Sequence, residues 1–236
     1  MPGARRAAPR RKRFYGTPPP GVSAADLKGY LIVIEGADGS GRSSQTRLLT
    51  QWLEQNGHAT VNVGLRRSTL VSAELNAAKR GNVLSRTTMS LFYATDFADQ
   101  LENVMIPAMR AGFVVLADRY IYTLMARDLV RGGDPEWVES LYGIAPVPDL
   151  VFLLRVSPRR LVQRNLEKNL ELDFWESAMD VAISRDRFDS FMAYQKMIAR
   201  EFTRMEEKYG FYPVNGNRTP TAVAATIRSR VAELVH

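Results

Sequence analysis

The chain has 236 residues, no cysteine, two histidines and a formal net charge of +7. The lack of cysteine excludes disulfides, thiolate metal sites and cysteine nucleophiles, and with only His58 and His236 a histidine base or zinc site is not expected. No stretch approaches the ~18 consecutive apolar residues of a membrane span. We therefore expect a cytoplasmic enzyme with one sizeable α/β domain and no membrane contact.

The positive charge is concentrated at the N-terminus. The first 21 residues contain six basic residues and no acidic one, which leaves +1 for the rest of the chain. Because this segment is also rich in proline and poor in apolar residues, we predict a disordered basic arm over residues 1–25 and one domain over residues 26–236. Three interpretations of the arm stay open: a solubilising tail, weak contact with nucleic acid or an acidic partner, and a transit peptide, which the prolines disfavour. The basic residues are Arg5, Arg6, Arg10, Arg11, Lys12 and Arg13.

The first predicted element of the domain is a buried parallel strand at Leu31–Ile34, a short β-branched apolar run. A glycine-rich loop follows. After the loop, the residues from Ser43 to Asn56 carry apolar side chains at helical spacing, and Gly57 stands where a C-terminal cap belongs. Strand, glycine loop and helix in this order form the context that a phosphate-binding loop needs.

The loop matches the phosphate-loop pattern G-x-x-x-x-G-K-[ST], except that Arg42 stands in place of lysine. Its glycines let the backbone bend around an anion, and the helix N-terminus adds positive potential. The hydroxyl of Ser43 is expected on Mg²⁺. An ordinary glycine turn before a helix is the alternative, and the flanking strand and helix argue against it. The predicted ATP-binding residues are Gly36, Ala37, Asp38, Gly39, Ser40, Gly41, Arg42, Ser43 and Ser44.

Strand and helix signals continue to alternate along the chain. Further strands are predicted at Thr60–Val63, Phe113–Leu116, Leu150–Leu154 and, more weakly, Phe211–Val214. Three helices are predicted to start at a capping residue followed by proline, at Asp134-Pro135, Ser157-Pro158 and Thr219-Pro220. The alternation predicts an α/β fold of the P-loop NTPase type, a doubly wound parallel sheet of about five strands flanked by helices.

In such folds, ligands bind at the carboxyl ends of the strands. Three segments fall there: the phosphate loop, Arg66-Arg67-Ser68 after the second strand, and Asp118-Arg119-Tyr120 after the third. Guanidinium groups suit phosphate dianions because they donate two parallel hydrogen bonds. A solvated pair on a loop is the alternative for Arg66 and Arg67.

From about Gly29 to the C-terminus, the chain resembles the thymidylate kinase family of nucleoside monophosphate kinases. The resemblance is carried by Ile34 to Gly41, by Asp118-Arg119-Tyr120 after a Val-Val-Leu strand, by Gly133 to Trp137, and by Pro148-Asp149-Leu150. The Asp-Arg-Tyr triplet is the more specific feature, since many kinases share the phosphate loop. The resemblance implies ATP-dependent phosphoryl transfer to a deoxynucleoside monophosphate, with dTMP as the expected acceptor and dTDP as the product.

The resemblance also implies roles for single residues. Asp38 would lie beside the acceptor sugar, Asp118 would support the shell of Mg²⁺ together with Ser43, and Arg119 would bridge the phosphates. The protein then positions two anions and screens their charge, with almost no covalent chemistry of its own.

On the acceptor side, Arg66 or Arg67 is expected to bind the acceptor's phosphate. In the family's base-recognition helix an aromatic residue stacks on thymine, and an arginine four residues on contacts the base edge. Tyr93 can stack, but Phe97 occupies the arginine position, and Arg127-Asp128 stands where the family often has Tyr-Gln. Packing of Tyr93 and Phe97 in the core is the alternative. The predicted acceptor-binding residues are Arg66, Arg67, Tyr93, Phe97, Arg119 and Arg127.

The arginine-rich stretch at about 164–191 corresponds to the family's helical lid, which closes over the donor and excludes water. Because Gly39 and Ser40 occupy the variable positions of the loop, we expect a lid arginine at the transferring phosphoryl, Arg164 first and Arg185 or Arg187 next. A charged helix surface is the alternative. The family tends to dimerise through helices like that predicted at Met89–Arg110, which implies a homodimer.

The substitution at Arg42 leaves three hypotheses. In the first, the chain is an active kinase in which arginine replaces lysine with altered geometry. In the second, it binds nucleotides but transfers phosphate slowly or not at all, and has a binding or regulatory role. In the third, the acceptor is a nucleotide other than dTMP, or a base at a nucleic-acid end held by the arm. The intact Asp38, Ser43, Asp118 and Arg119 favour the first. The predicted catalytic residues are Asp38, Arg42, Asp118, Arg119 and Arg164.

Overall fold

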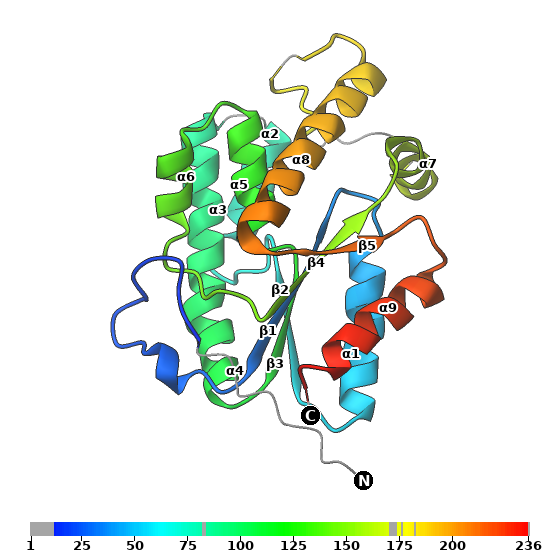
Figure 1. Ribbon diagram of the computed structural model, residues 1–236. Helices are drawn as coiled ribbons and strands as arrows, with labels where there is room; N and C mark the ends of the chain where they lie inside the picture. Colours follow the sequence, from blue (N-terminus) through cyan, green and yellow to red (C-terminus); the bar gives the residue numbers. More distant parts are fainter. Residues whose placement is uncertain (1–11, 82–83, 170–173, 176, 182, 236) are drawn as a thin grey trace.

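The structure is a computed structural model that describes residues 12–81, 84–169, 174–175, 177–181 and 183–235. Its centre is a parallel sheet with the strand order β2-β3-β1-β4-β5, seen in Figure 1. The predicted fold class and all five predicted strands are therefore confirmed, with ends shifted by one or two residues. The strands are β1 (Tyr30–Gly36), β2 (Thr60–Gly64), β3 (Val114–Asp118), β4 (Leu150–Arg155) and β5 (Tyr212–Asn215).

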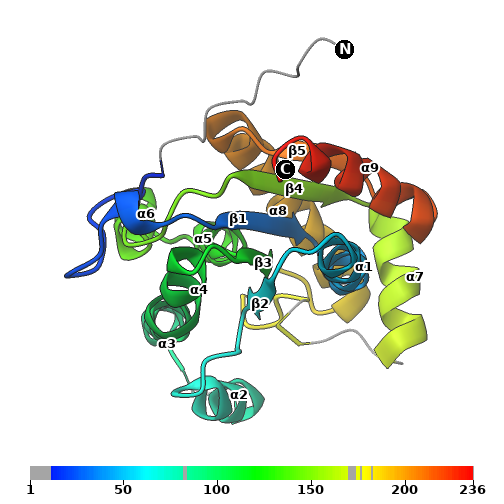
Figure 2. The same ribbon diagram turned by 90° about the horizontal axis from the view of Figure 1, so that it is seen from below.

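Helices cover both faces of the sheet, with α1 and α9 on one face and α3, α4, α5 and α8 on the other (Figure 2). Successive side chains of β1 enter the two layers in turn. Leu31 and Val33 belong to the larger core, while Ile32 and Ile34 pack with Leu49 of α1 in the smaller one. This alternation is the reason that the strand reads as a continuous apolar run. The helices are α1 (Arg42–Gln55), α2 (Ser72–Gly81), α3 (Arg86–Gln100), α4 (Ile106–Arg110), α5 (Ile121–Val130), α6 (Pro135–Leu141), α7 (Pro158–Asn169), α8 (Arg187–Tyr209) and α9 (Pro220–Ala232), with a π-helical stretch (Leu101–Met105) between α3 and α4.

Local sequence signals set several helix ends. The side chain of Asp134 accepts a hydrogen bond from the backbone N–H of Trp137 at 2.8 Å, and α6 begins at the following proline. Thr219 caps α9 in the same way. Gly57 has a φ of +84° just after the end of α1, a conformation that glycine adopts without the Cβ penalty.

The N-terminal segment differs from the prediction. Residues 12–25 lie against the domain: Lys12 pairs with Asp149, Phe14 forms a β-bridge with Pro146, and Tyr15 contacts the hydroxyl of Tyr122. The expectation of disorder up to residue 25 is therefore wrong for this part, because its aromatic residues pack on the apolar core. Residues 1–11, which include most of the arginines of the predicted arm, lie outside the described residues.

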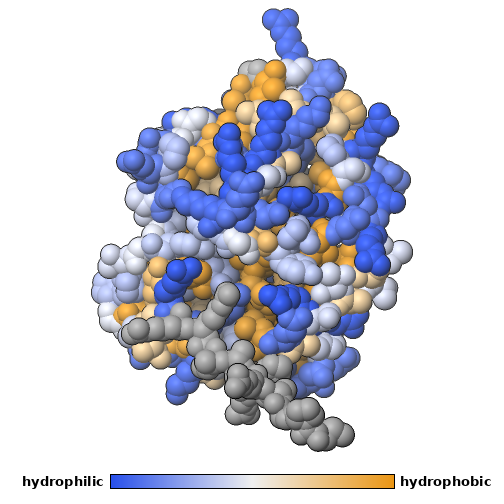
Figure 3. Space-filling view, viewed as in Figure 1, coloured by the Kyte–Doolittle hydropathy of each residue, from blue (hydrophilic) through white to orange (hydrophobic). Residues whose placement is uncertain are grey.

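Within the part of the chain that the structure describes, we find no helix with the length and apolar character needed to cross a bilayer. The face seen in Figure 3 has mostly hydrophilic side chains over α8, with hydrophobic ones between them. This pattern fits an amphipathic helix whose inner face, with Phe191, Tyr194, Ile198 and Phe202, is buried.

Candidate active site

The predicted phosphate loop connects the end of β1 to the first turn of α1. Gly36 has a φ of +148°, and a Cβ there would lie 2.8 Å from Oγ of Ser40 and 2.9 Å from the carbonyl oxygen of Leu154. Neither approach leaves room for a side chain, so glycine is required at this position. The loop closes tightly at the carboxyl end of the central strand, where ligands of parallel α/β folds bind. Ser43 and Ser44 are exposed on the first turn of α1.

Arg42 folds into the loop that carries it. Its guanidinium donates to the carbonyl oxygens of Gly36 and Ala37 and, through Nε, to Oδ1 of Asp118 at 3.0 Å. Only 8% of the residue is exposed. The guanidinium therefore links the two ends of the loop to β3 by several charge-assisted hydrogen bonds.

Asp118 also accepts a hydrogen bond from the hydroxyl of Ser43 at 2.6 Å. This contact places a hydroxyl and a carboxylate oxygen together, a pair of hard oxygen ligands that suits Mg²⁺. No group of three or more acidic, histidine or cysteine side chains within the described residues could hold a metal ion.

Asp38, in the middle of the loop, is surrounded by arginines from three elements. Nη2 of Arg42 lies 3.5 Å from Oδ1, Nη2 of Arg127 lies 3.3 Å from Oδ2, and the guanidinium of Arg119 also contacts Oδ1. The structure therefore brings together four residues predicted for the site. Their charges leave a surplus of positive potential, which favours anion binding.

Glu35 orders the turn between β3 and α5 and was not singled out by the sequence. Its buried carboxylate accepts hydrogen bonds from the backbone N–H groups of Tyr120 and Thr123 and from the hydroxyl of Thr123 at 2.6 Å. Burial raises the pKa of Glu35 above its ordinary value, and these hydrogen bonds lower it in part. The capped turn holds Arg119 at a φ of +71°, which is rare outside glycine and directs the side chain toward Asp38. The sequence feature that could have revealed Glu35 was a charged residue at the end of an apolar strand.

Helix α7 supports the loop from its outer side. Nη1 of Arg164 lies 3.3 Å from the carbonyl oxygen of Gly39, and Nδ2 of Asn165 lies 3.1 Å from that of Asp38. Arg164 was predicted as the lid arginine at the transferring phosphoryl group, and that role stays a prediction, since its guanidinium here lies against backbone carbonyl oxygens. Asn165 was not predicted. Arg185 and Arg187 are exposed where α8 begins.

The loop after β2 is fixed by Asp96, a second residue that sequence reasoning did not single out. The carboxylate of Asp96 is fully buried and accepts hydrogen bonds from the backbone N–H groups of Arg66 at 2.8 Å and Ser68 at 3.0 Å. The side chains of Ser72 and Gln100 donate to the same carboxylate. Arg66 and Arg67 are exposed on the loop that Asp96 holds.

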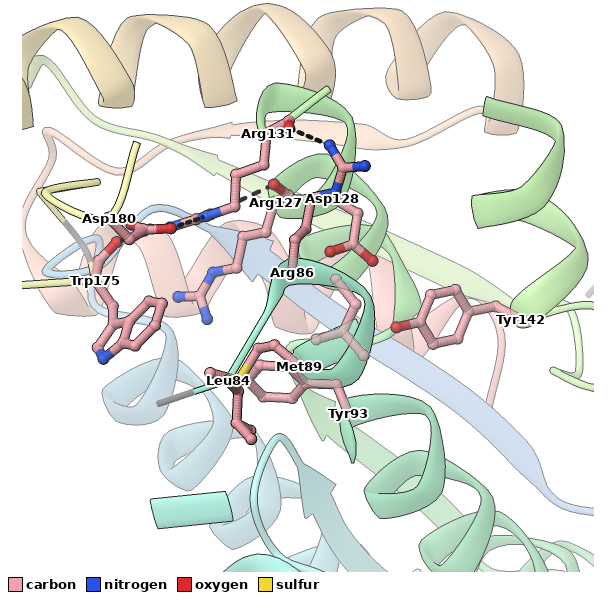
Figure 4. A pocket seen from close by; sticks show the side chains of 11 residues that line it. Leu84, Arg86, Met89, Tyr93, Arg127, Asp128, Arg131, Tyr142, Trp175 and Asp180 are labelled. Atoms are coloured by element: carbon pink, nitrogen blue, oxygen red, sulfur yellow. Dashed lines mark hydrogen bonds and ion pairs between the residues drawn. The ribbon is translucent and has the colours of Figure 1, made fainter. Parts of the chain in front are cut away.

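A cavity of about 220 Å³, which we call the Tyr93 cavity, opens between α3, α5 and the segment after α7 (Figure 4). It combines aromatic and apolar walls with several charged groups, the usual composition of a small-molecule site. Tyr93 and Arg127, both predicted for the acceptor, lie in its wall. The lining residues are Leu84, Arg86, Met89, Tyr93, Leu124, Arg127, Asp128, Arg131, Tyr142, Trp175 and Asp180.

Phe97 does not line this cavity. It is 6% exposed and packs edge-on against Tyr120 and Tyr142, with ring centroids 5.4 and 6.1 Å away. Its prediction as an acceptor-binding residue is therefore not supported by its position, and the alternative of a core residue is the better description. The helix turns this position inward, whereas Tyr93, one turn earlier, reaches the cavity.

Asp128 and Tyr142 place polar atoms in the wall of the Tyr93 cavity. Oδ1 of Asp128 accepts from the hydroxyl of Ser90 at 2.8 Å, while Oδ2 of Asp128 and the hydroxyl of Tyr142 are buried without a hydrogen-bond partner among the described residues. Figure 4 shows the Tyr142 hydroxyl directed toward the Asp128 carboxylate. Burial raises the pKa of Asp128 above its ordinary value.

Arg131 anchors the segment after α7 at the wall of the cavity. Its guanidinium forms a double ion pair with Asp180, at 2.8 and 3.0 Å, and donates to the carbonyl oxygen of Trp175 at 3.2 Å. Of the predicted lid, Trp175 and Asp180 therefore lie against α5 and the Tyr93 cavity. Arg164 and Asn165, at its beginning, lie against the phosphate loop instead.

The fold and the site define a phosphate-loop α/β protein in which three arginines converge on Asp38 at the carboxyl edge of the sheet, with an aromatic cavity beside them. The family model described as thymidylate kinase matches residues 34–208, and the chain belongs to the thymidylate kinase family. "Probable thymidylate kinase 2" of Saccharolobus solfataricus is 34% identical over 210 residues, covering 89% of this chain and 98% of that protein. "Probable thymidylate kinase" of Pyrococcus abyssi is 28% identical (78% of this chain, 85% of that protein), and "Thymidylate kinase" of Gloeobacter violaceus is 29% identical (85% and 93%).

Proposed function

We propose that this protein transfers the γ-phosphoryl group of ATP to dTMP and produces dTDP. The observation that carries the proposal is the junction of the phosphate loop with the Tyr93 cavity, at which arginines from three elements converge on Asp38. Family membership and the names of the relatives support the same acceptor. Phosphoryl transfer needs positioning and charge stabilisation, which such a site can supply without a general base.

On the donor side, the N–H groups of the phosphate loop would hold the ATP phosphates at the N-terminus of α1. Asp118 and Ser43 would hold Mg²⁺, which neutralises charge on the phosphate oxygens when it is bound. Arg164 keeps the outer wall of the loop in place through carbonyl oxygens. Arg42 maintains the shape of the loop from inside through Gly36 and Ala37.

On the acceptor side, the base would enter the Tyr93 cavity and stack on the Tyr93 ring. The sugar would lie near Asp38, and the phosphate would face Arg119. Arg66 and Arg67 would approach the phosphate from the loop that Asp96 fixes. Trp175 and Asp180, held by Arg131, would cover the bound nucleotide and exclude water.

The test is ADP release from ATP and Mg²⁺ with dTMP, dUMP, dCMP, dGMP and dAMP, against a reaction without acceptor. The Asp118→Asn variant controls for a contaminating kinase, because Asp118 binds both Arg42 and Ser43. We expect release that depends on dTMP and that this variant loses. ADP release with another acceptor but not with dTMP would identify that nucleotide as the substrate instead. ATP binding without release would identify a nucleotide-binding homologue that lacks the activity.

We further propose a cytoplasmic homodimer that forms through the outer surface of α3 and the π-helical stretch, where Leu91 and Val104 are exposed. Sedimentation of the wild type and of Leu91→Lys tests this proposal, since a charge in a dimer contact would shift the protein toward a monomer. Identical sedimentation as a monomer for both would reject the homodimer.

The basic arm is proposed to contact nucleic acid weakly. Removal of residues 1–11, which leaves the docked Lys12 in place, tests this idea through binding to a labelled DNA. An unchanged affinity would leave the arm as a solubilising tail.

A further inference from the structure

Two cavities meet at one arginine. The first is the Tyr93 cavity, and the second, which we call the phosphate-loop cavity, is lined by Gly36, Ala37, Asp38, Arg119 and neighbouring residues of α5 and α8. Among the described lining residues, Arg127 is the one that belongs to both. Its side chain extends from α5 into the Tyr93 cavity (Figure 4), and Nη2 lies 3.3 Å from Oδ2 of Asp38 on the phosphate-loop side.

The charges at this junction favour a pair of anions. Three guanidinium groups, from Arg42, Arg119 and Arg127, face the two carboxylates of Asp38 and Asp118. Arg127 is largely buried, with 18% of its side chain exposed, so its charge is screened less than that of a surface arginine. The planar guanidinium of Arg127 at this junction can donate to oxygens of two phosphate groups at once.

Arg42 does not occupy this position. Its guanidinium donates to the loop carbonyls of Gly36 and Ala37 and to Asp118, and lies 3.5 Å from Oδ1 of Asp38. Arg42 is not among the described lining residues of either cavity. In a loop with lysine, an ammonium point charge reaches the phosphates. Arg42 is therefore bound within the phosphate loop, and Arg127 is the arginine whose side chain lines both cavities.

We infer that Arg127 is a catalytic residue whose guanidinium bridges the acceptor's phosphate and the transferring γ-phosphoryl group. This inference rests on the proposed phosphoryl transfer and assigns part of it to a residue outside the phosphate loop. An oxygen of the acceptor's phosphate forms a bond to the γ-phosphorus, and the bond from that phosphorus to the β,γ-bridging oxygen breaks with its electron pair leaving on ADP. Arg127 stays protonated and donates to non-bridging oxygens, whose negative charge it stabilises.

The first experiment compares steady-state kinetics of the wild type, Arg127→Gln and Arg127→Lys. Arg204→Gln is the matched control, since Arg204 lies exposed on α8 and pairs with Glu201. We expect Arg127→Gln to lower kcat by about 10²- to 10³-fold while KM for either substrate changes by only a few fold, as for loss of a contact made in the transition state. Arg127→Lys should retain an intermediate kcat, because the charge is kept but the bridging fork is lost. Thermal unfolding of each variant reports any general loss of structure.

The second experiment is chemical rescue of Arg127→Ala by added guanidinium at concentrations well below those that unfold the protein, with methylammonium as the comparison. Restored kcat with guanidinium supports the catalytic role. A higher KM with unchanged kcat, or an unchanged enzyme, overturns it and leaves Arg127 as a binding or structural partner of Asp38. The kcat and KM of each variant are compared with those of the wild type using the acceptor that the wild type accepts. The comparison is therefore independent of whether that acceptor is dTMP. A wild type that accepts no nucleotide rejects both proposals.

Discussion

Nε of Arg42 lies 3.0 Å from Oδ1 of Asp118, so the residue that replaces the phosphate-loop lysine is bound to the carboxylate proposed for Mg²⁺. These residues are 76 positions apart in the chain, and β1 and β3 bring them together as neighbouring parallel strands. The other carboxylate oxygen accepts from Ser43. Asp118 is thus held from both sides, and its orientation depends on the arginine.

This geometry predicts the effect of restoring lysine. An ammonium group cannot bind Asp118 and both loop carbonyls in the planar arrangement of a guanidinium, so Arg42→Lys is expected to lower kcat about tenfold. Arg42→Ala should lower kcat by about 10²-fold or more, because the buried carboxylate of Asp118 then loses its positively charged partner and keeps only the hydroxyl of Ser43. Arg47→Lys, an exposed position on the same helix, is the control. A rise in kcat for Arg42→Lys would instead indicate that arginine impairs the loop.

A second prediction concerns the loop that carries Arg66 and Arg67. Asn at position 96 offers one acceptor oxygen where the buried carboxylate of Asp96 offers two, and it adds an amide N–H that faces donors. We expect Asp96→Asn to lower the free energy of unfolding by about 1–3 kcal/mol and to raise KM for the acceptor. Denaturant unfolding and initial rates check both effects. Glu102→Gln, an exposed position beyond α3, should change neither, and equal values for Asp96→Asn and wild type would show that this anchor is dispensable.

The fold could be predicted from the sequence because the patterns that mark its strands and helices are local. Apolar runs such as Leu31–Ile34 and Leu150–Leu154 mark strands buried on both faces, and proline after a capping residue marks the starts of α6 and α9. Composition misled at residues 12–25. There, Phe14 and Tyr15 outweigh the prolines and basic charges, because the ring of Tyr15 packs against those of Tyr122 and Tyr209.

The site was only partly accessible, because its contacts join distant parts of the chain. The sequence indicated that Asp38 and Arg127 matter, but their contact spans 89 positions and follows from the placement of α5 over the loop. Asp96 and Glu35 act by accepting backbone N–H groups of other segments, which no spacing rule reveals. Phe97 was placed in the site by resemblance, yet the register of α3 turns it into the core.

The position of Phe97 gives a third prediction. Introducing the arginine that the family carries there would bury an unpaired charge among Tyr120 and Tyr142, so Phe97→Arg is expected to lose about 3 kcal/mol or more of unfolding free energy. Phe97→Leu keeps an apolar group and should lose about 1 kcal/mol. Denaturant unfolding measures both. An arginine variant with wild-type stability and a lower KM for dTMP would contradict this description and show that position 97 reaches the base.

The buried carboxylate of Asp128 predicts a dependence of stability on pH. Burial raises the pKa of Asp128 in the folded protein, with partial compensation by Ser90 and nearby arginines, above the ordinary value of 3.8 that applies when the chain is unfolded. The folded state therefore binds this proton more tightly, and the free energy of unfolding decreases as pH rises from the unfolded pKa through the folded one. Asparagine does not titrate, so Asp128→Asn removes this contribution.

Unfolding by denaturant from about pH 4 to about pH 8 measures the difference between the wild type and Asp128→Asn. We expect the wild type to lose stability relative to the variant as the pH increases, and the difference to level off once Asp128 is ionised in both states. Glu207→Gln, an exposed substitution on α8, supplies the baseline. A difference that is constant with pH, or that grows in favour of the wild type, would show that the carboxylate is better stabilised in the folded protein than its burial beside Tyr142 indicates.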